Sequence, residues 1–154
     1  MDTSIVVWII DLIVVAALLL AGGIIRKRML SHADRVNDYF MYALIAYTRF
    51  NDEDAKVAAI AAGKVAGRKQ RNSMVVGLRA YASELAKTVE HPELEPVMHK
   101  VSEIATEMSA KDWAVRDAAH EKQRLHERNP EYLKALNKAD PNVFVRKYGD
   151  LSQY

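Results

Sequence analysis

The sequence contains no cysteine, which excludes disulfide bonds and every metal site built on cysteine thiolates. Glycine and proline are scarce, at 6 and 4 of 154 residues, so we expect no long flexible linker. The formal net charge is only +2, and this near balance gives no overall argument for a nucleic-acid partner. What remains is one long apolar run followed by a series of helical patterns.

The apolar run covers residues 5–25 and reads IVVWIIDLIVVAALLLAGGII, with a single charged side chain. A helix of this length spans about 31 Å, close to the hydrocarbon thickness of a bilayer. A cleaved signal peptide carries its positive charge before the apolar core, whereas Arg26, Lys27 and Arg28 follow it here. We therefore expect a retained transmembrane helix, the alternative being an apolar helix buried in a complex.

The basic residues also predict the orientation of this span. Lysine and arginine that flank a span stay on the cytoplasmic side, and none precedes residue 5. We expect the N-terminus outside and residues 26–154 in the cytoplasm, in a bacterial inner membrane or its equivalent.

Asp11 is the one costly residue in the run, because a carboxylate inside a bilayer costs on the order of 3 kcal/mol. At about 100° per residue it shares a stripe with Val15, Leu18 and Gly22, where glycine permits close helix approach. This stripe predicts contact with a partner inside the membrane. The alternative is a protonated or water-accessible aspartate near the outer surface.

Beyond residue 28 the patterns are helical almost throughout. Apolar spacing and capping residues predict helices at about 31–50, 54–71, 73–90, 96–128, 130–138 and 141–148. Short connections favour antiparallel neighbours. We therefore expect an all-α protein: a transmembrane anchor (1–28), an antiparallel bundle of about four helices (29–128), and short helices with a docking tail (129–154).

Two aromatic clusters are candidates for protein interfaces. Tyr39, Phe40 and Tyr42 lie in a stretch that is apolar on every face, which indicates either the central core helix or a subunit interface. Phe144 and Tyr148 lie in an apolar C-terminal tail. That tail either packs on the bundle or docks on another protein.

A basic cluster is the candidate lipid surface. Residues 26–79 hold 11 basic and 5 acidic side chains. The residues expected to contact lipid headgroups are Arg26, Lys27, Arg28, Lys64, Arg68, Lys69 and Arg71. A solvated helix end explains part of the cluster, because helix ends favour bases. Nucleic acid is the weaker alternative and is not an expected partner, because no aromatic residue interleaves with these bases.

The sequence offers no catalytic or cofactor motif. His99, Glu103 and Glu107 are spaced four apart on one helix face, but the Glu-x-x-His pairs of a di-metal bundle are missing. His120 and His126 are six apart, whereas a zincin helix needs a spacing of four. We expect a solvated acidic face, no metal, no cofactor and no enzyme activity.

The function predicted from these features is that of a non-enzymatic accessory or scaffold subunit of a larger membrane assembly. Its partners would be membrane lipid and other membrane subunits, a second copy of the chain included. In architecture alone, the order of span and long helices resembles LemA-like bacterial proteins and the inner-membrane spanins of phages. The resemblance implies no site and no activity. The alternative function, which rests on the basic helix ends, is a freestanding membrane-surface or lysis-type factor that acts on the bilayer.

Overall fold

The computed structural model describes residues 3–109 and 115–154, without the side chains of residues 26–31, 109 and 115–117. The described residues are helical and contain no strand, which confirms the all-α prediction. The helices are α1 (Thr3–Phe50), α2 (Glu53–Val65), α3 (Arg68–Thr88), α4 (Leu94–Ser109), α5 (Val115–Arg128), α6 (Pro130–Asn137) and α7 (Asn142–Tyr148). α1 includes both the apolar run and the helix predicted at about 31–50.

The chain divides by its own packing into two compact units, Met1–Asp34 and Arg35–Tyr154. The first unit is the apolar part of α1. Within the described residues, Thr3–Ile25 is the one stretch long and apolar enough to cross a membrane, and none of it is buried. The functional boundaries expected after residues 28 and 128 stay predictions.

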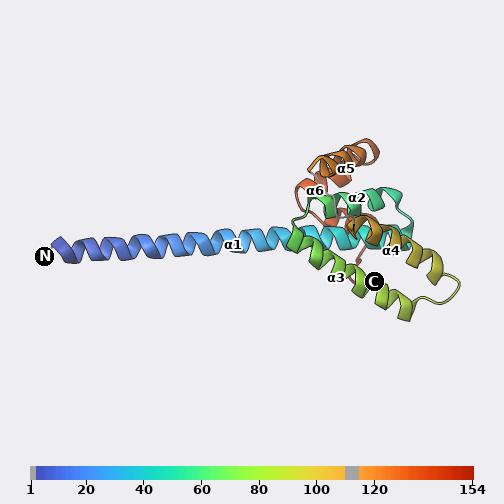
Figure 1. The fold of residues 1–154 in the computed structure, drawn as a ribbon, viewed down its shortest axis with the longest axis horizontal. Helices are drawn as coiled ribbons and strands as arrows, with labels where there is room; N and C mark the ends of the chain where they lie inside the picture. Colours follow the sequence, from blue (N-terminus) through green and yellow to red (C-terminus); the bar gives the residue numbers. More distant parts are fainter. Residues whose placement is uncertain (1–2, 110–114) are drawn as a thin grey trace. The chain divides into compact units, whose positions relative to one another are not determined.

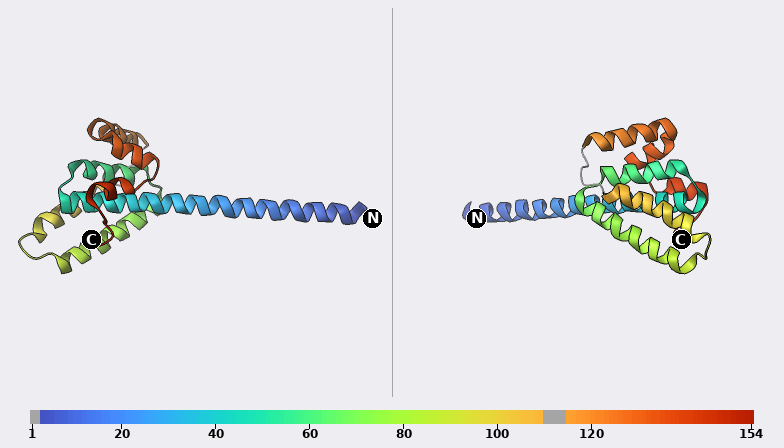
Figure 2. Two further views of the ribbon diagram at one scale, coloured as in Figure 1. Left: turned by 180° about the vertical axis from the view of Figure 1, so that it is seen from behind. Right: turned by 45° about the vertical axis from the view of Figure 1, so that its right-hand side comes forward.

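The second unit is a helical bundle in which α2 is the central helix. α2 contacts α4, α5 and α6, and α3 packs on α4 (Figure 1). The other two views show the same arrangement around residues 35–50 of α1 (Figure 2). α2 can take so many neighbours because its buried positions are mostly alanine or glycine, which lets helices approach closely.

Aromatic side chains fill the centre of this bundle. Tyr39, Phe40, Tyr132 and Phe144 are all nearly or completely buried. The Phe144 ring lies 5.0 Å from the ring of Tyr39 and 4.8 Å from that of Tyr132, measured between centroids. The C-terminal helices therefore close the core that α1 begins.

One helix boundary differs from those expected, and a second part of the prediction falls on residues that the structure does not describe. The helix predicted over 54–71 ends at Val65, because Ala66 and Gly67 take extended backbone conformations and α3 begins at Arg68. The single helix predicted over 96–128 is described as α4 and α5, and residues 110–114 between them lie outside the described residues. Consequently, Arg68, Lys69 and Arg71 occupy the start of a helix instead of its end.

Truncation of a core ring tests this packing. Phe144→Ala should lower the free energy of unfolding of the full chain in mild detergent by about 4 kcal/mol, because the ring leaves a cavity. Urea titration followed by circular dichroism measures the change. Val76→Ala is the control, because Val76 is 66% exposed and its truncation should alter stability by less than about 0.5 kcal/mol. Equal effects of the two variants would contradict this core.

Candidate functional site

The most developed polar site of the bundle lies where α1 gives way to α2. α1 ends at Phe50, and Asn51 adopts a left-handed conformation with φ of 56° that turns the chain. Asp52 is the N-cap of α2, and its Oδ1 accepts a hydrogen bond from the Ala55 amide at 3.1 Å. An aspartate suits this position because its side chain satisfies an amide that the helix leaves without a carbonyl partner. α2 thus begins at Glu53, within one residue of the start of the helix predicted over about 54–71.

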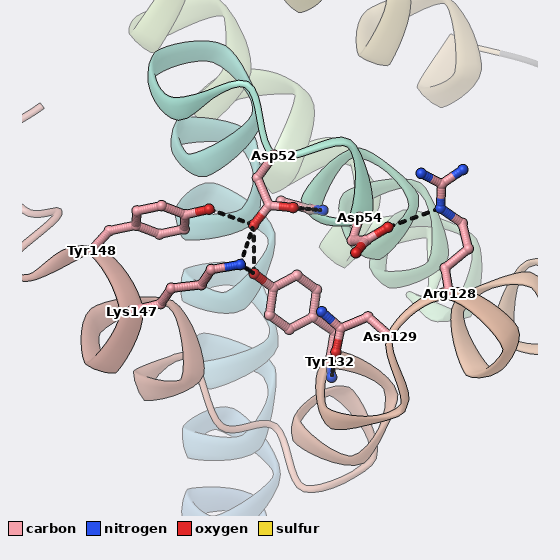
Figure 3. Close-up of polar contacts among 8 residues, drawn as sticks. Asp52, Asp54, Arg128, Asn129, Tyr132, Lys147 and Tyr148 are labelled. Atoms are coloured by element: carbon pink, nitrogen blue, oxygen red, sulfur yellow. Dashed lines mark hydrogen bonds and ion pairs between the residues drawn. The ribbon is translucent and has the colours of Figure 1, made fainter.

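The other carboxylate oxygen of Asp52 contacts side chains of the C-terminal helices α6 and α7 (Figure 3). Its Oδ2 accepts hydrogen bonds from the hydroxyl of Tyr132 at 2.5 Å and from that of Tyr148 at 2.7 Å. The Lys147 ammonium lies 3.5 Å from the same oxygen. Asp52 therefore joins the start of α2 to α6 and α7.

Burial and hydrogen bonding act in opposite directions on this carboxylate. Burial alone would raise the pKa of Asp52. The hydrogen bonds from Tyr132 and Tyr148, the Ala55 amide and the Lys147 charge together hold that pKa below its ordinary value of 3.8. Burial and the neighbouring carboxylate raise the pKa of Tyr132 and of Tyr148, so both hydroxyls stay protonated as donors. The site is thus a charged carboxylate that accepts hydrogen bonds from two neutral tyrosine hydroxyls and a backbone amide, beside the Lys147 ammonium.

Further contacts tie this site to the rest of the bundle. The Tyr39 hydroxyl donates to the Tyr132 carbonyl at 2.7 Å, and Asn129 caps α6 by accepting from the Tyr132 amide at 3.3 Å. Arg128 pairs with Asp54 at 2.9 Å. Because the oxygens of Asp52 already accept from three donors and face an ammonium, the arrangement fastens helices together and leaves little capacity for a substrate.

A second cluster centres on Glu103 of α4. Its carboxylate lies 2.6 Å from the Lys56 ammonium, accepts from the Tyr47 hydroxyl at 2.9 Å and lies 3.1 Å from Nε2 of His99. The hydrogen bonds from Lys56 and Tyr47 lower the pKa of Glu103. The acidic face expected to be solvated is thus partly engaged with α1 and α2.

Lys64 occupies a third cluster, inside the bundle. Its ammonium lies 3.2 Å from Glu121 and 3.7 Å from Glu107, and its side chain is only 12% exposed. Arg124 approaches the other oxygen of Glu121 at 3.4 Å. The sequence suggested that Lys64 contacts lipid headgroups, but this ammonium is enclosed by carboxylates of α4 and α5.

The remaining headgroup candidates separate into two groups. The side chains of Arg26, Lys27 and Arg28 lie outside the described residues. Arg68 and Lys69 are exposed at the start of α3, and Arg71 beside them is half-buried.

The aromatic interface candidates lie in or against the core of this chain. Tyr39, Phe40 and Phe144 have no exposed surface, and Tyr42 and Tyr148 are half-buried. A side chain without exposed surface cannot contact a partner in this conformation. The aromatic stretch of α1 and the C-terminal tail therefore pack on one another, as the core alternative supposed.

The residues expected to contact a partner inside the membrane are exposed, in contrast to these aromatic side chains. Asp11, Val15 and Leu18 are exposed within the chain, and a Cβ atom added to Gly22 would meet no atom within 4 Å. Among the described residues of the first unit, none covers the stripe.

The described residues contain no group of three or more histidine, aspartate or glutamate side chains arranged to hold a metal ion. A surface hollow of about 540 Å³ lies beside α6 and α7 and is lined in part by Lys134, Lys138 and Arg146. Arg146 is paired there with Asp140 at 3.4 Å. Comparison with protein families, curated proteins and solved structures found no match for this chain.

The pKa of Asp52 predicts how stability depends on pH. Because this pKa is lower in the folded chain than 3.8, its contribution to stability is complete above that value and is lost as the pH falls through the folded value. Asp52→Asn should cost about 2 kcal/mol near pH 7, and the difference from the native chain should shrink as the pH falls below 3.8.

Urea denaturation of the full chain in detergent across this pH range measures both effects. Glu131→Gln is the matched control, since Glu131 is an exposed acid of the neighbouring α6. Its effect should stay within about 0.5 kcal/mol. A pH-independent cost of Asp52→Asn would show that the charge of this carboxylate is not what holds the helices.

Proposed function

We propose that this chain is a non-enzymatic single-pass membrane subunit, an accessory or scaffold component of a larger membrane protein assembly. The observation that carries the proposal is the apolar part of α1: Thr3–Ile25 is long and apolar enough to cross a bilayer, and its side chains are exposed among the described residues. Such a surface is stable only in lipid or against other apolar helices.

The bundle supports a scaffold role because its polar clusters join helices. Asp52 holds α6 and α7, Glu103 joins α4 to α1 and α2, and Lys64 joins α2 to α4 and α5. Each of these groups already has charged or hydrogen-bonding partners within the chain. A rigid domain with its polar interior occupied in this way suits binding and positioning better than catalysis.

The partner surface of this proposal is the anchor stripe of Asp11, Val15, Leu18 and Gly22. An aspartate inside the membrane is stabilised by a hydrogen-bonding or oppositely charged partner, and the first 25 residues contain no lysine, arginine or histidine to supply one. Gly22 lets a second backbone approach on the same stripe. The stripe therefore suits a helix of another membrane subunit.

Adjacent glycines supply a matched test of this surface. Gly22→Val lies on the stripe, whereas Gly23→Val points about 100° away from it. Neither valine would clash within this chain, because an added Cβ at either site meets nothing within 4 Å. Gly22→Val and Asp11→Asn should each reduce the co-purified partner by about threefold or more, and Gly23→Val should not.

Affinity purification of the full chain from native membranes in mild detergent, with quantitative mass spectrometry, measures this loss. The proposed role would be contradicted if the chain purifies as a monomer, or if Asp11→Asn leaves its co-purified proteins unchanged.

The absence of cysteine allows a direct test of orientation. Ser4→Cys introduces one thiol at the N-terminal end of the apolar stretch, and Ser83→Cys introduces one in α3 of the bundle; both serines are exposed. If the bundle is cytoplasmic, a membrane-impermeant maleimide added to intact cells should label position 4 and not position 83. Detergent permeabilisation should make both sites reactive. Labelling of position 83 in intact cells would reverse the proposed orientation.

A further inference from the structure

α3 presents a basic face to solvent along almost its whole length. At about 100° per residue, an arc of about 100° contains Arg68, Lys69, Asn72, Val76, Arg79, Ser83 and Lys87, which we call the α3 basic face. All of these side chains are exposed. Glu84, the only acid of α3, lies about 60° outside this arc and pairs with Lys87 at 3.8 Å.

The stability of α3 itself does not account for this distribution. Arg68, Lys69 and Arg71 lie in its first turn, which contains no acid, although the positive end of the helix dipole disfavours bases there. The N-cap is Gly67, whose lack of a side chain leaves the first amides without a capping acceptor. Helix-end preferences therefore do not explain why the exposed bases Arg68 and Lys69 lie at the start of α3.

The opposite side of α3 fixes the direction of this face. Met74, Leu78, Tyr81 and Leu85 are buried, and the Tyr81 hydroxyl is 2.7 Å from that of Thr48 on α1. The helix therefore cannot turn about its axis without breaking the core. Val76 is 66% exposed in the middle of the basic face, where it adds an apolar group between cationic ones.

We propose that the α3 basic face docks on the headgroups of anionic lipids, with its arginine and lysine side chains at lipid phosphates and Val76 at the level of the headgroups. The inference rests on the proposed membrane anchor, because the covalent tether keeps the bundle close to a bilayer and raises the effective concentration of lipid at this face. Nucleic acid is disfavoured because the arc contains no aromatic side chain on which a base could stack.

The test uses the full chain in nanodiscs of phosphatidylcholine, with or without about one third phosphatidylglycerol. The Ser83→Cys chain carries an environment-sensitive fluorophore on the basic face, and Ser102→Cys carries the same probe on an exposed site of α4. Quenching by acrylamide at position 83 should fall about threefold in the anionic nanodiscs, and quenching at position 102 should not change. Salt at about 1 M should restore quenching at position 83.

The charge dependence is tested with Arg68→Gln, Lys69→Gln and Arg79→Gln combined in the labelled chain. This variant should lose the lipid-dependent protection while keeping the circular dichroism spectrum of the native chain. Equal quenching in both kinds of nanodisc would overturn the inference, as would protection by added RNA but not by anionic lipid.

Size-exclusion chromatography distinguishes a failure of the proposed anchor from a failure of the headgroup contact. An anchored chain should co-elute with neutral nanodiscs. A chain that does not co-elute lacks the proposed anchor altogether. A chain that co-elutes without charge-dependent protection at position 83 overturns the headgroup contact alone.

Discussion

The bundle depends on one ionised carboxylate that serves two parts of the chain at once. Asp52 begins α2 through its hydrogen bond with the Ala55 amide, and it holds the hydroxyls of Tyr132 and Tyr148 with its second oxygen. A buried charge of this kind is tolerated only while its donors are in place. The same carboxylate therefore starts α2 and fixes where α6 and α7 pack.

Local patterns in the sequence were sufficient for the helical class and for most helix positions. The apolar run of residues 5–25, the acidic start after Phe50 and the Asn129-Pro130 start of α6 each lie within a few residues of the element they specify. The break at residues 66–67 was missed because alanine and glycine also fitted a close-packed helix there. Whether a small residue packs or caps depends on neighbours that are distant in sequence.

The clusters around Asp52 and Lys64 could not be predicted for a related reason. Their partners are separated by 80 residues for Asp52 and Tyr132 and by 57 for Lys64 and Glu121, so no spacing rule connects them. A weak signal existed in the tyrosines at 132 and 148, since buried tyrosine hydroxyls usually need an acceptor. Asp52 looked like an ordinary capping residue, and Lys64 like one more member of a basic cluster.

The 96-residue separation between Asp52 and Tyr148 has a consequence for biosynthesis. During translation the apolar helix and α2 are made long before α7, so the early helices wait with an aspartate that still lacks one of its tyrosine donors. A chain that ends before position 148 would carry the complete apolar helix and α2, but it would lack the hydroxyl that completes the Asp52 junction.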